Sequence, residues 1–152
     1  MLDSRYWNYN IGDSGWGNNE WQYYQRENAS LNDGYLVITA KRQSKGNSDY
    51  TSARIKTEGQ FDFTYGRVDI RAALPRGQGI WPALWALGSN FGDVGWPYSG
   101  EIDIMEYTGK EPDLILGTIH GPGYAGAGGK STWFRQEFDV FEDWHTYAIE
   151  WD

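Results

Sequence analysis

The sequence predicts an all-β protein built as a sandwich or a barrel. Aromatic residues make up 17% of the 152 positions, including 9 Trp and 11 Tyr, and 20 residues are Gly. Aromatic and β-branched side chains favour strands, and clusters of Gly, Pro, Asn and Asp separate the short apolar runs as turns do. We expect a single domain over residues 1–152, because a chain of this length can bury a hydrophobic core.

Seven segments have the composition of strands, whereas none has convincing helical periodicity. Charged and apolar side chains alternate in segment 66–75, as in a half-buried strand, and Pro75 ends it. Asn32-Asp33-Gly34 is typical of a hairpin turn. A single helical turn is the most that we expect within 137–144, and the glycine-rich run 123–130 is interpreted as a flexible loop beside a cleft. The predicted strands are 35–42, 52–57, 66–75, 83–88, 101–108, 114–121 and 145–152.

Charge and composition exclude several classes of partner. The formal net charge of -8 disfavours binding to nucleic acid or to an anionic membrane, and it suits a neutral ligand. The chain has no Cys, so neither a disulfide framework nor thiol chemistry is available. No apolar run is long enough to span a bilayer, and the first ten residues do not resemble a signal peptide.

The segment GEIDIMEY, residues 100–107, holds the strongest candidate site. Glu101 and Asp103 point to the same face of a strand, because alternate side chains share a face. Glu106 lies five positions after Glu101 and should point the other way. One inserted residue, a β-bulge at Ile104–Met105, would return Glu106 to the face of the other two acids.

Three carboxylates on one face suit a retaining glycosidase. Such an enzyme needs one ionised carboxylate as nucleophile and a second carboxyl that is first an acid and then a base. Close carboxylates push their pKa values apart, which helps to keep one proton in the cluster, and a third acid can tune that coupled titration. The alternatives are a solvent-facing edge strand and a Ca²⁺ site.

Several segments together resemble glycoside hydrolase family 16, in the bulged form of its laminarinase-like members. They are GWGNNEWQYY (15–24), YTSARI (50–55), YGRVDIRAALPRGQGIWPALWALG (65–88), WPYSGEIDIMEY (96–107) and GTIHGPGY (117–124). The resemblance implies a jelly-roll β-sandwich (concanavalin A-like) of two antiparallel sheets with a concave substrate cleft. It also implies hydrolysis of β-glucans with retention of configuration.

The resemblance also implies a role for each matching residue. Glu101 corresponds to the nucleophile, Asp103 to the assisting acid and Glu106 to the general acid/base. Trp96 corresponds to the tryptophan that stacks under the sugar at the cleavage point. The remaining implied substrate-binding residues are Trp81 and Trp85 beside the cleft, Asn19 and Arg54 on the glycone side, and His120 near the cleavage site.

The expected function is therefore endo-hydrolysis of 1,3-β-D-glucosidic bonds in laminarin-type glucans. Two alternatives stay open: a mixed-linkage 1,3-1,4-β-glucanase (lichenase), and a glucan-binding sandwich without turnover. The chemistry requires no metal or organic cofactor, and the sequence alone gives no support for a structural Ca²⁺. We expect the natural protein to be secreted, with β-glucan as its partner and neither nucleic acid nor membrane.

The resemblance further implies that the first strand and the C-terminal part of the family domain are absent from this chain. A jelly roll without those strands would expose apolar faces and unpaired edges. We therefore expect that a complementary chain, or self-association, completes the sandwich.

Overall fold

The computed structural model describes residues 1–137, 141 and 143–152, and it confirms the all-β prediction. The described strands form five hydrogen-bonded sheets rather than two continuous ones. One pairing departs from the expected antiparallel pattern, because β2 (Gln22–Tyr24) runs parallel to β6 (Ser48–Ser52). The chain divides into two compact units, residues 1–62 and 63–152, and each is described by itself.

The first unit contains short strands joined by tight turns. The expected hairpin turn is present: Asp33 and Gly34 have φ of 50° and 84°, the left-handed conformation that such a turn requires. The remaining strands of this unit are β1 (Asn8–Asn10), β3 (Ala29–Asn32), β4 (Tyr35–Ile38), β5 (Lys41–Lys45) and β7 (Arg54–Lys56), with one 3₁₀ turn, η1 (Arg26–Asn28).

A buried polar network lies at the centre of the first unit. The Asn28 side chain donates to the Thr39 carbonyl at 2.6 Å and to the Thr51 hydroxyl at 3.0 Å, and it accepts from the Gln25 amide at 2.6 Å. Asn28 and Thr51 are almost completely buried. Because each of these groups has a partner, the network can be buried without a large desolvation cost.

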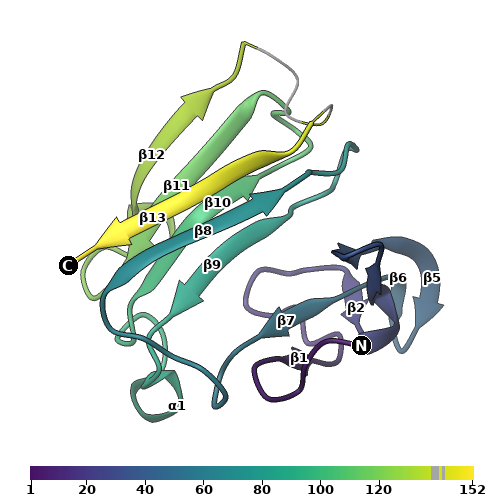
Figure 1. The fold of residues 1–152 in the computed structure, drawn as a ribbon, viewed down its shortest axis with the longest axis horizontal. Coiled ribbons are helices and arrows are strands. Elements are labelled where there is room, and N and C mark those ends of the chain that lie inside the picture. Colours follow the sequence, from purple (N-terminus) through teal and green to yellow (C-terminus); the bar gives the residue numbers. More distant parts are fainter. Residues whose placement is uncertain (138–140, 142) are drawn as a thin grey trace. The chain divides into compact units, whose positions relative to one another are not determined.

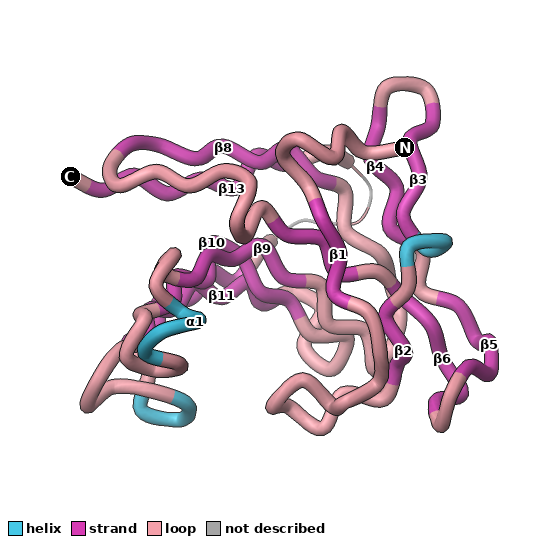
Figure 2. The backbone as a smooth tube through the Cα atoms, turned by 90° about the horizontal axis from the view of Figure 1, so that it is seen from below, coloured by secondary structure: helices cyan, strands magenta, loops and turns pink. Residues whose placement is uncertain are grey.

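The second unit consists of a four-stranded antiparallel sheet and a two-stranded pair. The sheet has the order β12-β11-β10-β9, and the pair is β8 with β13. The pair crosses one face of the sheet in Figure 1, and the two form separate layers in Figure 2. The elements of this unit are β8 (Gly66–Ala72), β9 (Ala83–Leu87), α1 (Phe91–Val94), β10 (Glu101–Tyr107), β11 (Leu114–His120), η2 (Gly126–Gly128), β12 (Lys130–Arg135) and β13 (His145–Trp151).

The hydrophobic core of the second unit lies between these two layers. Met105 and Tyr107 of β10 and Ile115 of β11 are buried there with Tyr147 of β13, and Leu74 completes the cluster. Met105 is fully buried, as the bulge hypothesis requires for one of Ile104 and Met105. The face of β10 that carries the acids is therefore the face turned away from β8 and β13.

Strand β12 corrects one interpretation of the sequence. The run 123–130 was expected to be a flexible loop, but it contains η2 and the first residue of β12. Thr132, Trp133 and Phe134 in the following residues are the β-formers that could have indicated this strand. The helical turn expected within 137–144 falls largely outside the described residues.

Large apolar side chains are exposed on both units. They include Leu31, Leu36, Val37 and Ile38 on the β3–β4 hairpin and Phe134 on β12. The expectation that another segment or chain covers such surface stays a prediction, as does the assignment of residues 1–152 to one domain. Among the described residues, no helix is long and apolar enough to cross a membrane.

Candidate active site

The bulge in β10 lies where the spacing of the acids predicts it. The pairing of β10 with β11 shifts register between Asp103 and Glu106, and its pairing with β9 shifts between Asp103 and Met105. The extra residue is accommodated around Ile104, since Met105 already pairs with Leu84 of β9. A bulge of this kind redirects the side chains that follow it.

The three acids share one face of the sheet. On β11, Glu101 lies opposite His120, Asp103 opposite Thr118, and Glu106 opposite Leu116. These partners are alternate residues of one regular strand, so they point to one side, and directly opposite residues of an antiparallel pair share that side. The geometric hypothesis drawn from the sequence is therefore confirmed.

Two tryptophan side chains donate hydrogen bonds to the glutamates. Trp96 Nε1 donates to Glu101 Oε2 at 2.5 Å, and Trp81 Nε1 donates to Glu106 Oε1 at 3.1 Å. Both indoles are about half exposed, at 45% for Trp96 and 47% for Trp81. Each ring can therefore orient a carboxylate and still present apolar surface to a ligand.

His120 contacts the central acid. Its Nε2 lies 3.2 Å from Asp103 Oδ2, and its ring lies edge-on to Trp96 with centroids 6.0 Å apart. Among the described residues, the buried Nδ1 of His120 has no hydrogen-bond partner. Gly129 gives the histidine its space, because a Cβ at that position would lie 2.4 Å from His120 Cε1.

The surroundings of the acids raise two of their pKa values. Burial, then the charges of Glu101 and Glu106, then a hydrogen bond to Glu101 raise the pKa of Asp103 to about 8. Burial and the charge of Glu101 also raise the pKa of Glu106, while the Trp81 hydrogen bond and His120 act in the opposite direction. The cluster therefore retains a proton near neutral pH, as expected, and the raised pKa of Asp103 assigns that proton to the central acid.

Trp85 lies on the same face as the acids. It pairs with Asp103 across β9 and β10 and is half-buried. Trp81 lies before β9, at an exposed position, so both tryptophans expected beside the cleft are in the second unit with the acids.

Asn19 and Arg54 belong to the first unit. Asn19 is exposed and has a positive φ of 56°. The Arg54 guanidinium lies 5.3 Å from the centre of the Trp16 ring. Next to Trp16, the Tyr24 hydroxyl donates to Glu20 Oε2 at 2.6 Å. This polar and aromatic cluster is suited to contacts with hydroxyl groups.

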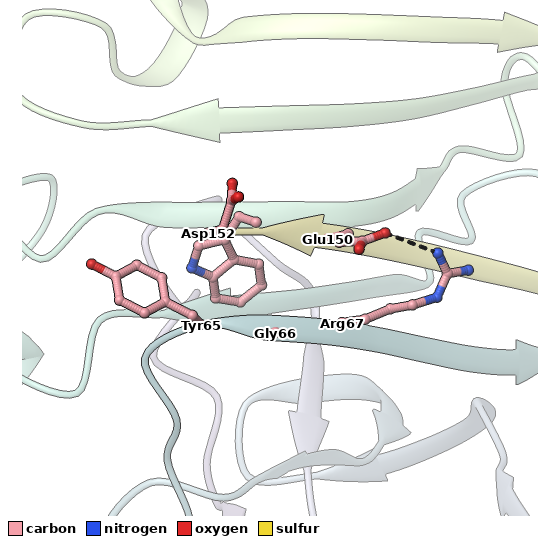
Figure 3. A pocket seen from close by; sticks show the side chains of 6 residues that line it. Tyr65, Gly66, Arg67, Glu150 and Asp152 are labelled. Carbon is pink, nitrogen blue, oxygen red and sulfur yellow. Dashed lines mark hydrogen bonds and ion pairs between the residues drawn. The ribbon is translucent and has the colours of Figure 1, made fainter.

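A separate hollow lies at one end of the β8–β13 pair. It has a volume of about 490 Å³, and an Arg67–Glu150 ion pair of 3.3 Å borders it (Figure 3). None of the candidate site residues lines it. The lining residues are Tyr65, Gly66, Arg67, Glu150, Trp151 and Asp152.

Among the described residues, no group of three or more His, Cys, Asp or Glu side chains is arranged to hold a metal ion. The site is instead a carboxylate cluster with bound indole N–H groups, placed on one face of an antiparallel sheet. A carboxylate cluster on one face of a sheet is the kind of site that retaining glycosidases use.

Comparison with known proteins identifies the family. The model of the glycosyl hydrolases family 16 matches residues 16–152, so the chain belongs to that family. The catalytic domain of a laminarinase from Thermotoga maritima has a TM-score of 0.97 and 47% identity, covering 100% of this chain and 66% of that one. This match confirms the jelly-roll fold class.

Two curated relatives agree with this assignment. A beta-glucanase of Rhodothermus marinus is 44% identical over 99% of this chain and 55% of its own length. A glucan endo-1,3-beta-glucosidase of Cryptopygus antarcticus is 41% identical over 95% of this chain and 57% of its own length. The chain thus spans little more than half the length of these relatives.

Proposed function

We propose that this chain carries the catalytic acids of an endo-acting β-glucanase. The enzyme hydrolyses internal 1,3-β-D-glucosidic bonds of laminarin-type glucans with retention of configuration. The observation that carries the proposal is the bulged strand β10, which brings Glu101, Asp103 and Glu106 to one face of one sheet. Membership of the family and the names of the relatives support a β-glucan substrate.

In the first step Glu101 is the nucleophile. Its carboxylate forms a bond to the anomeric carbon while the bond from that carbon to the glycosidic oxygen breaks. Glu106 transfers its proton to the leaving oxygen, and burial, which raises its pKa, favours the protonated form that this step requires. Trp96 holds one oxygen of Glu101 by its N–H and so orients the nucleophile.

In the second step Glu106 is the base. Now ionised, it accepts a proton from the water that attacks the glycosyl–Glu101 ester, and the nucleophile is released. The Trp81 N–H stabilises the ionised form of Glu106. Protonated Asp103 donates to Glu101 and so stabilises the carboxylate when it leaves. These steps require neither a metal nor an organic cofactor.

Substrate binding follows from the same face of the sheet. In the second unit, Trp96 and Trp85 supply apolar surface for sugar rings, and His120 lies beside the cleavage point. For Asn19 and Arg54 of the first unit, the proposed role as polar contacts for sugar hydroxyls rests on the resemblance to the family alone. A polysaccharide substrate of this kind is too large to enter a cell, which supports secretion of the protein.

The decisive experiment measures release of reducing ends from laminarin and from lichenan. Turnover of laminarin in excess of lichenan supports the proposal, whereas preference for lichenan indicates a mixed-linkage enzyme. Binding of laminarin without release of reducing ends would instead establish a glucan-binding sandwich.

Variants of the acids test their roles. Glu101→Ala should be nearly inactive, and azide should restore turnover with an inverted product; Glu106→Ala with azide should give a retained product. Glu150→Ala, an exposed glutamate on β13, is the matched control and should retain activity. Equal losses at both sites without rescue would show that the acids are a structural cluster.

A further inference from the structure

Strand β12 extends the acid-bearing face by one more aromatic residue, Trp133. Glu106 of β10 lies opposite Leu116 of β11, and Leu116 lies opposite Trp133 of β12. Directly opposite residues in antiparallel strands share a face, so Glu106 and Trp133 belong to one row across the sheet. In the neighbouring row, the hydroxyls of Thr118 and Ser131 lie 2.9 Å apart, as this shared orientation requires.

Trp133 is open to solvent on this face. Its exposed fraction is 66%, which is larger than that of the two indoles bound to the acids. The next residue on its side of β12, Arg135, is engaged by Asp113 and lies 3.9 Å from Glu111. The indole is therefore an exposed apolar surface on the same face as a site for a neutral, hydroxyl-rich polymer.

The spacing of strands sets the reach of this surface. Glu106 and Trp133 are separated by two strand-to-strand steps, or roughly 10 Å between Cα atoms. That separation is longer than one pyranose ring, so a sugar on Trp133 does not belong to the pair that flanks the cleaved bond. It belongs to a unit farther along the glucan, on the side of β11 and β12.

We propose that Trp133 is a substrate-binding platform that lengthens the glucan site across β12. This inference rests on the proposed function and adds to it a preference for long chains. The C–H face of a sugar ring packs against the flat indole, and an indole loses little conformational entropy because it has only two side-chain torsions. The polymer gains this contact, and a short oligosaccharide that ends before β12 does not.

A contact this far from the reacting carbon should affect KM more than kcat. Binding that is equally strong in the ground state and the transition state lowers KM and leaves the chemical step unchanged. Loss of one aromatic contact of this kind corresponds to roughly a three- to tenfold loss of affinity.

The test compares Trp133→Ala with Phe134→Ala. Phe134 is the next residue of β12, is 60% exposed, and lies opposite Ile115 of the core face, so it is matched in position and exposure but faces the other way. Trp133→Ala should raise KM for laminarin roughly three- to tenfold, with kcat changed less than twofold, and should leave KM for a short β-glucan oligosaccharide unchanged. Phe134→Ala should leave kcat and the KM for laminarin unchanged.

Calorimetric titration of laminarin into Glu101→Gln, with and without Trp133→Ala, separates binding from catalysis. Weaker binding of laminarin to the double variant supports the platform even if the parent protein shows no turnover. Absence of turnover in the parent would refute only the hydrolytic function. An active parent in which Trp133→Ala and Phe134→Ala behave alike would overturn the inference. Equal losses of activity of Trp133→Ala on long and short substrates, together with a lowered melting temperature, would also overturn the inference, because they indicate a structural role.

Discussion

Asp103 should make the stability of this protein depend strongly on pH, and Asp103→Asn should remove most of that dependence. The folded-state pKa is about 8 and the ordinary value is 3.8, so the folded state binds more protons than the unfolded state between these two values. The free energy of unfolding therefore falls as pH rises through this window, and the contribution of Asp103 to this decrease is complete above about pH 8. Below about pH 4 both states are protonated and the residue has no such effect.

The magnitude follows from the same two values. Each pKa unit corresponds to about 1.4 kcal/mol, so a rise from 3.8 to about 8 lowers the free energy of unfolding by at most on the order of 5 kcal/mol across the window, and solvent screening of the cluster makes the decrease smaller. Asparagine has no charge to desolvate and occupies nearly the same volume. The variant should therefore be more stable than the parent at pH 8 and close to it at pH 4.5.

Urea unfolding followed by tryptophan fluorescence at intervals between pH 4.5 and 8.5 measures the effect. Asp69→Asn is the matched control, because Asp69 is exposed and its hydrogen bond to Arg67 lowers its pKa. In that variant, the free energy of unfolding should depend on pH as it does in the parent across the whole range. Parallel curves for the parent and Asp103→Asn would refute the reasoning, since they would show that Asp103 is ionised in the folded protein.

Two further predictions concern the positioning of the acids. Trp81→Phe removes the N–H that lowers the pKa of Glu106, so the alkaline limb of the kcat/KM profile on laminarin should move up by roughly one pH unit. Gly129→Ala places a Cβ 2.4 Å from His120 Cε1, so the histidine must move, and kcat should fall roughly ten- to a hundredfold.

Each of these variants has a control within the second unit. Trp151→Phe removes a comparable indole N–H, which donates to the Thr64 carbonyl at 2.9 Å, and it should not move the pH profile. At Gly128 a Cβ would meet nothing within 4 Å, so Gly128→Ala should retain activity. An unmoved alkaline limb in Trp81→Phe, or a fully active Gly129→Ala, would contradict the corresponding prediction.

The amino-acid sequence was sufficient to predict the fold class, most strands of the second unit and the shared face of the three candidate acids. The shared face of the acids could be predicted from residues 101–107 alone, because a strand has a side-chain period of two and the odd step to Glu106 requires a bulge. The hairpin turn at Asp33–Gly34 could also be predicted from the sequence, since its left-handed backbone restricts which residues fit. Such features depend on neighbours in the chain.

Contacts between residues of distant segments could not be predicted from local patterns and became visible in the folded chain. The contact of His120 with Asp103 and the space left by Gly129 arise from strand pairing, whose register no local pattern in this chain specifies. The raised pKa of Asp103 likewise depends on burial, because desolvation is a property of the packed sheet and not of the motif. Strand β12 was missed because the glycines before it indicated a loop, although its own residues Thr132, Trp133 and Phe134 are β-formers; its pairing with β11 places it in the sheet.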